Sequence, residues 1–267
     1  IVYCLTVRDT ETVTEWLTAN GISALAYSGD SADRPAVEQA LLDNTVKVVV
    51  ATSALGMGFD KPDLSFVVHF QAPGSAVHYY QQVGRAGRQL KQSHGVLLCG
   101  REDAQIQDWF IDSAFPTADD AATVIDALDR CDGYVRAAQI EGAVNIGRTR
   151  LTNILKNLEV DRFVTADGQK YQRTAVPYSY DHARVEAITA VRRAEQAQMT
   201  EYAALTSGCR MAYLGAALDD PHAEPCGICD LCTAPPLPVS YDPALAARAA
   251  DFLRAQPMVI EPRKQWP

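Results

Sequence analysis

The sequence predicts an α/β protein in which a domain built on a parallel sheet is followed by a mostly helical half. Within residues 1–115, short runs rich in β-branched and aromatic residues alternate with helical patterns, which is typical of parallel sheets covered on both faces. After Pro116 the pattern changes to helices and one hairpin signal, and a later segment carries four closely spaced cysteines. At 267 residues the chain has room for two or three small domains.

The first domain is expected to contain five strands and three helices. The strands are expected at residues 1–6, 24–27, 47–52, 66–70 and 95–99. The helices are expected at residues 10–19, 32–43 and 76–83. The first helix ends before Asn20-Gly21, a common C-terminal signal. Parallel sheets bind ligands beyond the carboxyl ends of their strands, so the loops after the strands are the first candidates for a site.

The helical half begins with a segment that has a winged-helix outline. Helices are expected at residues 117–130, 136–143 and 148–159, and two short β runs flank Asp167-Gly168, a dipeptide typical of tight hairpins. The net charge of −9 disfavours nucleic-acid binding, since phosphate contact needs positive surface. Residues 146–173, however, hold six basic and three acidic residues, so we expect a face that binds duplex DNA. The expected DNA contacts are Arg148, Arg150, Lys156 and Lys170. The alternative is a winged helix used only for packing.

Four cysteines after a long helical pattern (residues 181–206) predict a structural zinc site. Sixteen residues separate the first from a C-x₂-C-x₂-C run, and four thiolates would complete a tetrahedron with no position left for water. The ligands would be Cys209, Cys226, Cys229 and Cys232. The alternatives are reduced structural cysteines or two disulfides. Cys4 and Cys99 lie in strand patterns and are expected in the core. This cysteine usage favours a reducing, cytoplasmic setting.

Two further segments carry residues suited to phosphate groups. A glycine-containing loop at residues 51–62 follows a strand, and Thr52 offers a hydroxyl there. Further along, Arg85 and Arg88 are three residues apart, which predicts that both lie on one helical face. The planar arginine fork suits phosphate oxygens. Taken separately, these features also fit an ordinary loop and a solvated helix face.

Together these segments resemble the second RecA-like domain of superfamily 2 helicases, and in particular of RecQ helicases. Residues 2–4 resemble motif IV, residues 49–62 resemble motif V, and residues 78–88 resemble motif VI. The cysteine segment at residues 209–232 is similar to the RecQ zinc module. The predicted divisions are a RecA-like lobe (1–115), a winged helix (116–180), a zinc module (181–236) and a linker (237–267) that starts a further region with one short helix at residues 243–255.

The resemblance implies part of an ATP-dependent DNA helicase that moves 3′ to 5′ and acts in DNA repair or recombination. It implies that Arg88 is the arginine finger for an ATP held with Mg²⁺ mainly by another lobe. Arg85 and Gln81 would support it, and Asp60 would approach the nucleotide or the interlobe contact. A positioned guanidinium stabilises the charge that develops on a transferred phosphoryl group. Thr52 would contact the phosphates of the tracked single strand.

The sequence departs from the family pattern at several places, which suggests a divergent RecQ-like branch. Gln82 stands where the family usually has an acidic residue, and Gln89-Leu90 stands where Asp-Gly is usual. Asp60 occupies a place where Asn is common. The winged-helix outline also precedes the cysteines instead of following them. Residues 259–267 resemble a linker leading into a phosphoribosyltransferase-like domain.

The residues that would hold ATP and magnesium in such a motor are missing from this sequence. It contains neither Gly-x-x-x-x-Gly-Lys-Thr/Ser nor Asp-Glu-x-His. It begins within a strand pattern and stops without completing a domain, so we expect a piece of a longer protein that does not hydrolyse ATP alone. No apolar run approaches the ~20 residues of a membrane span. The alternatives are a non-enzymatic DNA-binding or regulatory module with a degenerate RecA-like lobe, and an RNA helicase.

Overall fold

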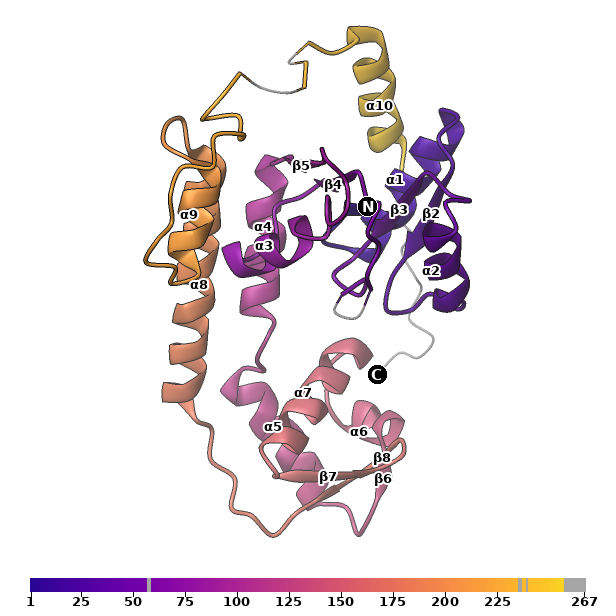
Figure 1. The fold of residues 1–267 in the computed structure, drawn as a ribbon. Coiled ribbons are helices and arrows are strands. Elements are labelled where there is room, and N and C mark those ends of the chain that lie inside the picture. The colour runs from indigo at the N-terminus through magenta and orange to yellow at the C-terminus, as the bar shows by residue number, and fades with distance from the viewer. Residues whose placement is uncertain (57–58, 235–236, 239, 257–267) are drawn as a thin grey trace. The chain divides into compact units, whose positions relative to one another are not determined.

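The computed structural model of the chain describes residues 1–56, 59–234, 237–238 and 240–256 (Figure 1). The described residues fall into two compact units. The first comprises Ile1–Gln107 with the described part of Arg192–Met258, and the second comprises Asp108–Val191. The cysteine segment therefore belongs to the same compact unit as the first domain. The division into four domains derived from the sequence stays a prediction.

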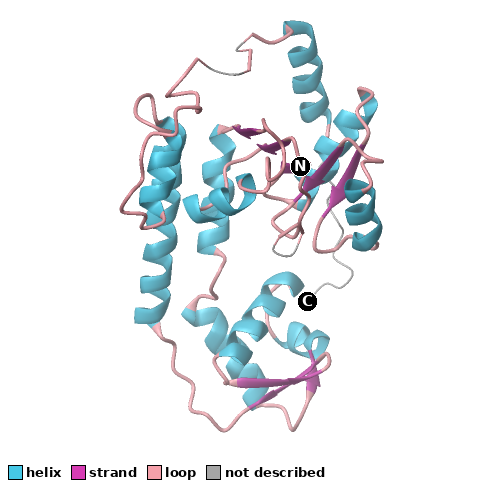
Figure 2. Cartoon of the chain, viewed as in Figure 1, coloured by secondary structure: helices cyan, strands magenta, loops and turns pink. Residues whose placement is uncertain are grey.

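A five-stranded sheet forms the centre of the first unit (Figure 2). Its order is β2-β3-β1-β4-β5, and every neighbouring pair is parallel. The strands are β1 (Val2–Tyr3), β2 (Ala24–Tyr27), β3 (Val48–Ala51), β4 (Phe66–His69) and β5 (His94–Leu97). The predicted α/β class with a parallel sheet is confirmed.

The apolar run of β3 explains why this sheet is buried on both faces. Val48 and Val50 point to a cluster that includes Val13 and Leu17 of helix α1. Val49 and Ala51 point to the opposite cluster, in which Leu41 belongs to helix α2. Successive side chains of a strand alternate between faces, so four consecutive apolar residues supply both layers. The helices of the first unit, two of which (α4 and α8) run across its boundaries, are α1 (Val7–Ala19), α2 (Arg34–Leu42), α3 (Ala76–Val83), α4 (Arg101–Asp112), α8 (His182–Ala204), α9 (Arg210–Ala217) and α10 (Pro243–Ala255).

Strand β1 is shorter than predicted and helix α1 is longer. The sequence predicts a strand over residues 1–6, but β1 ends at Tyr3 because Thr6 is already the cap of α1. The Thr6 hydroxyl oxygen accepts a hydrogen bond from the Asp9 backbone N–H at 3.0 Å, which satisfies a donor that the first helical turn leaves open. Helix α1 therefore begins at Val7, before the predicted start at residue 10.

Among the described residues, the second unit contains three whole helices, parts of α4 and α8, and a small antiparallel sheet. The helices are α5 (Ala118–Asp129), α6 (Ala137–Ala143) and α7 (Arg148–Val160), and the strands are β6 (Val135–Arg136), β7 (Val164–Asp167) and β8 (Lys170–Arg173). The sheet order is β6-β8-β7. Strands β7 and β8 form the predicted hairpin, and Gly168 in its turn has a φ of +59°, which favours glycine. Leu151, Ile154 and Leu155 of α7 lie in the core of this unit.

Three elements have no counterpart among the predicted ones: α4, α9 and β6. Helix α9 begins directly after Cys209, whose thiol occupies the N-cap position that usually belongs to a serine or threonine. One further expectation is wrong: Cys99 is exposed, because β5 ends at Leu97, whereas Cys4 is buried as predicted.

Part of motif V (residues 57–58) and the whole of the segment compared with a phosphoribosyltransferase linker (259–267) lie outside the described residues. Among the helices that the structure describes, none combines the length and apolar character needed to cross a bilayer.

Candidate functional site

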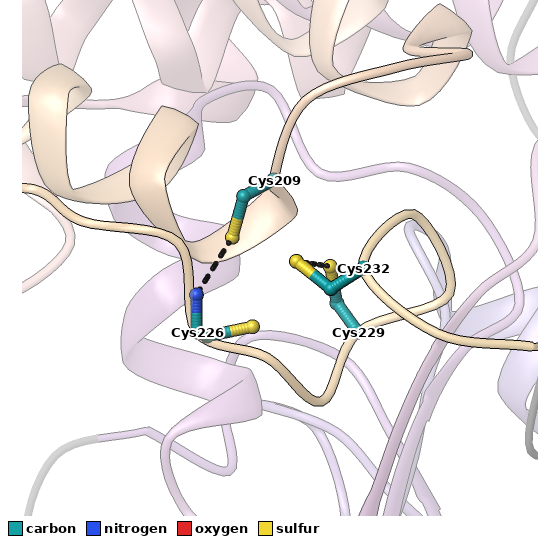
Figure 3. A group of neighbouring side chains, drawn as sticks. All are labelled: Cys209, Cys226, Cys229 and Cys232. Atoms are coloured by element: carbon teal, nitrogen blue, oxygen red, sulfur yellow. Dashed lines mark hydrogen bonds between the residues drawn. The ribbon is translucent and has the colours of Figure 1, made fainter.

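The four predicted zinc ligands converge on one point in the first unit (Figure 3). Their Sγ atoms all lie within 4.8 Å of one another, and those of Cys229 and Cys232 are 3.5 Å apart. Around a zinc ion with Zn–S bonds of ~2.3 Å, tetrahedral sulfur atoms are ~3.8 Å apart. The cluster is therefore close to the geometry that zinc requires, and the seven cysteines of the chain are free thiols.

The ionisation of the thiols also fits a bound cation. Burial alone would raise the pKa of Cys209, but the backbone N–H groups of Cys226 and Ala212 donate to its Sγ and lower the pKa to about 6. The N–H of Gly227 lowers the pKa of Cys232, yet the Cys229 thiol and burial outweigh it and raise that pKa to about 11. Negative charge gathered on one thiolate thus opposes ionisation of the next. A divalent cation would remove this conflict.

An arginine fixes the cysteine loop (residues 226–232) to the end of α8. The Nε and Nη2 atoms of Arg210 donate to the two carboxylate oxygens of Asp230 at 2.9 and 3.0 Å. Its Nη1 atom donates to the carbonyl oxygen of Tyr202 at 2.7 Å. Bidentate pairs of this kind are geometrically specific, and this one lowers the pKa of Asp230 through its hydrogen bonds to Arg210. The sequence places Arg210 beside the first cysteine, but its spacing alone indicates no role for it.

The two motif VI arginines do not lie on a helix, which corrects the prediction. Helix α3 ends at Val83, and Gly84 forms its C-cap. Gly87 has a φ of +80°, a conformation that L side chains rarely adopt and that prevents the helix from continuing. Arg85 and Arg88 therefore lie in a turn, here called the arginine turn (residues 84–89).

The arginine turn is tied to the loop that follows β3. The Gly87 N–H donates to the Leu64 carbonyl oxygen at 2.9 Å, and the Gln89 N–H donates to that of Pro62 at 3.0 Å. The buried side chain of Lys61 holds the same loop by donating to an Asp63 carboxylate oxygen at 2.6 Å. Segments that resemble motifs V and VI thus form one local structure.

The two arginines are held in different ways. The Nη1 atom of Arg85 donates to the Phe59 carbonyl oxygen at 2.8 Å, and its Nε atom is buried with no hydrogen-bond partner among the described residues. The Nη1 atom of Arg88 donates to Asp60 at 2.7 Å. The side chains of Arg88 and Asp60 are 46% and 66% exposed. Arg85 is thus built into the protein, whereas Arg88 is on its surface.

The other predicted site residues of this unit, Gln81 and Thr52, do not take part in the contact between the arginine turn and the loop after β3. Gln81 is exposed on α3, and Thr52 directly follows β3, where its hydroxyl oxygen accepts the N–H of Ala54 at 3.3 Å. Gln82, noted only as a departure from the family, contacts the buried His69: its Oε1 atom lies 2.8 Å from Nε2 of His69. Burial lowers the pKa of His69 to about 4, so the imidazole is neutral near pH 7 and donates from Nε2.

The four predicted DNA contacts of the second unit fall into two pairs. Arg148 is ion-paired with Glu141 at 3.1 Å, and Arg150 is ion-paired with Asp120. Lys156 on α7 and Lys170 on the hairpin are exposed, with no side-chain partner among the described residues.

The positive segment is less positive at its surface than its sequence suggests. Arg173 is only 14% exposed, and its Nε atom lies 3.2 Å from a carboxylate oxygen of Asp129. Its guanidinium also donates to the carbonyl oxygens of Phe163 and Val176. Arg173 is therefore a structural residue of this unit, because its side chain is committed to joining the hairpin to its surroundings.

Several known proteins are similar to part of this chain. The family model described as helicase conserved C-terminal domain matches residues 1–89. RecQ-like DNA helicase blm-1 of Caenorhabditis elegans is 42% identical over 106 residues, or 39% of this chain and 11% of that protein. Probable ATP-dependent DNA helicase RecS of Bacillus subtilis is 36% identical over 135 residues, or 49% of this chain and 27% of that protein.

Two further similarities are to a protein named as an RNA helicase and to a DEAD-box protein. Putative ATP-dependent RNA helicase R290 of Acanthamoeba polyphaga mimivirus is 35% identical over 113 residues, or 42% of this chain and 21% of that protein. Among solved structures, the E. coli DEAD-box protein SrmB bound to RraA matches with a TM-score of 0.37 and 26% identity, over 40% of this chain and 64% of that chain. The curated relatives confirm the RecQ resemblance, and the chain spans only 11 to 27% of their length.

Proposed function

We propose that this chain is part of an ATP-dependent DNA helicase of the RecQ family, because its residues 1–89 match the helicase conserved C-terminal domain and its curated relatives include a RecQ-like DNA helicase. In this proposal the first unit supplies the arginine finger and contacts to the tracked strand. ATP and Mg²⁺ are held mainly by a lobe that precedes this one. The finer expectations, 3′-to-5′ movement and a role in DNA repair or recombination, rest on the family resemblance.

The observation that carries the proposal is the different anchoring of Arg85 and Arg88. An arginine finger needs a backbone that is held in place and a guanidinium that can change partners. The reason is that the guanidinium has to meet a phosphate that arrives with another domain. Arg85 fixes the turn through Phe59. Arg88 is exposed, and its ion pair with Asp60 is a surface contact, which typically contributes only ~0–1 kcal/mol. Exchanging that carboxylate for a γ-phosphate therefore costs little.

For the DNA contacts, we propose separate roles for the two units. Thr52, at the carboxyl end of β3, would contact the phosphates of the single strand. The second unit, read as a winged helix, would bind duplex DNA mainly through Lys156 and Lys170, because no described residue pairs with their charges. Arg148 and Arg150 would contribute less, because they already have acidic partners. The four cysteines would hold zinc and stabilise the loop around them.

The proposal is tested in the full-length protein with Arg88→Ala. Loss of an arginine finger lowers kcat by ~10³-fold or more, and DNA affinity should stay within about twofold, since the proposed partner of Arg88 is the γ-phosphate of ATP and not the DNA strand. Arg254→Ala is the control, because Arg254 is also an exposed arginine paired with an aspartate, Asp251, on α10. ATP turnover at the wild-type rate in Arg88→Ala would contradict the proposal.

Two alternatives lead to other outcomes of the same assay. A non-enzymatic module with a degenerate lobe predicts no ATP turnover from the full-length protein with any nucleic acid. An RNA helicase, favoured by the similarity to the mimivirus protein, predicts that RNA stimulates turnover more strongly than DNA. Parallel titrations with single-stranded DNA and RNA of equal length distinguish these cases.

A further inference from the structure

Four aromatic rings form a continuous row inside the first unit. The ring centroids of Tyr3 and His69 are 5.4 Å apart, those of His69 and Tyr79 are 4.7 Å apart, and those of Tyr79 and Tyr202 are 5.1 Å apart. These distances are typical of interacting aromatic pairs. The residues come from β1, β4, α3 and α8, and all four are buried. The row therefore joins the sheet, through α3, to the helix that precedes the cysteines.

An arginine lies at each end of this row. The hydroxyl of Tyr3 donates to the Leu55 carbonyl oxygen at 3.1 Å, and Ala86 of the arginine turn packs against the buried cluster that contains Tyr3. The nearby charge of Arg85 opposes the burial that raises the Tyr3 pKa to about 12. At the other end, the Arg210 guanidinium carbon lies 5.5 Å from the centroid of the Tyr202 ring, a cation–π distance. Arg210 also donates two hydrogen bonds to the Asp230 carboxylate in the cysteine loop. The row thus lies between the cysteine loop and Arg85 of the arginine turn.

The interior of the row allows few other arrangements. The rings of Tyr79 and Tyr202 are tilted against each other, and the Oε1 atom of Gln82 on α3 is bonded to Nε2 of His69. Met199 and Leu214 pack beside Tyr79 and Tyr202 in one buried cluster. Closely packed interiors transmit displacements, and buried polar networks favour one geometry. A change in the Tyr202 ring is therefore expected to move Tyr79 and α3, the helix that leads into the arginine turn.

We propose that the row of Tyr3, His69, Tyr79 and Tyr202 couples the cysteine loop to Arg85, so that Arg210 is a positioning residue for the arginine turn. This inference rests on the proposed function for its effect on ATP turnover. Its structural part, a coupling between Arg210 and the buried rings, does not. A row of neighbouring rings is not by itself proof of coupling, which has to be measured as non-additivity between its two ends.

The first test is a double-mutant cycle on ATP turnover in the full-length protein. Arg210→Gln removes the charge above Tyr202, and Tyr3→Phe removes the hydroxyl beside Arg85. Each is expected to lower kcat by about fivefold at unchanged affinity for DNA, and the double variant is expected to lose about fivefold and not ~25-fold. Arg210→Lys keeps a cation at this place and should recover part of the rate. Losses that simply multiply would overturn the proposal.

The matched control is Arg184→Gln. Arg184 is likewise a partly exposed arginine, and it is bonded to a carboxylate, Asp161, at 2.7 Å within the second unit. Its effect, combined with Tyr3→Phe, should multiply. Non-additivity of the same size for Arg184→Gln would show a general loss of stability and would overturn the specific role of Arg210.

The second test does not depend on ATP hydrolysis. The chain has five histidines, so the ring signals of His69 can be assigned by NMR in histidine-labelled protein with a His69→Gln variant. Arg210→Gln should shift the His69 signals, and Arg184→Gln should leave them in place. Unshifted His69 signals in Arg210→Gln would overturn the coupling. Absence of ATP turnover in the full-length protein together with shifted signals would instead overturn the proposed function alone.

Discussion

Arg88 donates to Asp60 across 2.7 Å, although 28 positions separate the two residues in the chain. The pair forms because the arginine turn runs beside the loop after β3, where Gly87 and Gln89 bond to the backbone. Arg85, in the same turn, bonds to the carbonyl oxygen of Phe59, the neighbour of Asp60. Adjacent residues of one loop thus hold the two arginines, one within the protein and one on its surface.

This difference predicts unequal effects of the two arginines on stability. Arg85→Ala should lower the free energy of unfolding by about 2 kcal/mol, since it removes a hydrogen bond from a charged, partly buried group. Arg88→Ala and Asp60→Asn should each lower it by less than about 1 kcal/mol, as expected for an exposed ion pair. Urea denaturation of the three variants measures this. A larger loss of unfolding free energy for Arg88→Ala than for Arg85→Ala would contradict the distinction between a structural Arg85 and a surface Arg88.

The cysteine cluster predicts one zinc ion per chain. The protein purified under reducing conditions should contain zinc, and Cys229→Ser should lose it, because all four thiolates are needed to close the tetrahedron. Zinc binding is coupled to folding, so a strong chelator should lower the melting temperature of the wild type. Cys131→Ser is the control, since Cys131 is exposed and outside the cluster. Metal analysis that finds no zinc in the wild type would refute the site.

The buried His69 predicts a loss of stability on acidification. Its pKa is lowered from 6.5 to about 4 by burial, so between these values the unfolded chain binds a proton that the folded chain does not. Stability is therefore fully present above pH 6.5 and declines as the pH falls toward 4, by up to about 3 kcal/mol. Denaturation curves from pH 4 to 8 should show this slope, and His69→Gln should reduce it. Equal slopes for the wild type and His69→Gln would contradict this prediction.

Much of the first unit could be predicted because its signals are local. The apolar run of β3 and the Asn20-Gly21 stop of α1 identify their elements without tertiary information. Helix α9 could not be predicted in the same way, because the cysteine spacing presents Cys209 only as a ligand, although its thiol also accepts a helix N–H. The residue has two roles, and the sequence pattern displays one of them.

The contacts of the candidate residues could not be predicted from the sequence. The spacing of Arg85 and Arg88 matches one helical face, but the positive φ of Gly87 excludes a helix there. The aromatic row could not be predicted, because Tyr3 and Tyr202 are almost two hundred residues apart in the chain and meet only through the folded positions of the rings between them. Sequence spacing indicates which residues are neighbours on one helix or strand. The aromatic row is made of residues from four different elements, so spacing does not reveal it.

The absence of phosphate-binding motifs predicts that the 267-residue chain is inactive on its own. Without a lysine on the phosphates or carboxylates for magnesium, Arg88 has no nucleotide to stabilise. DNA-stimulated ATP hydrolysis by this chain should therefore not exceed the background of its Arg88→Ala variant. The full-length protein, assayed at the same concentration, is the positive control. Turnover by the chain that disappears in Arg88→Ala would show that it contains a nucleotide site of its own.

The unpaired lysines of the second unit predict where its DNA affinity comes from. Removing one phosphate-binding lysine should reduce the slope of log K against log salt by about 1. We expect this for Lys156→Ala and Lys170→Ala, measured by fluorescence anisotropy with duplex DNA between about 50 and about 200 mM salt. Arg148→Ala should change the slope less, because Glu141 already neutralises that arginine. Lys47→Ala, an exposed lysine of the first unit, is the control. Equal slopes for the wild type and both lysine variants would mean that the surface with Lys156 and Lys170 does not bind DNA, as in the alternative of a winged helix used only for packing.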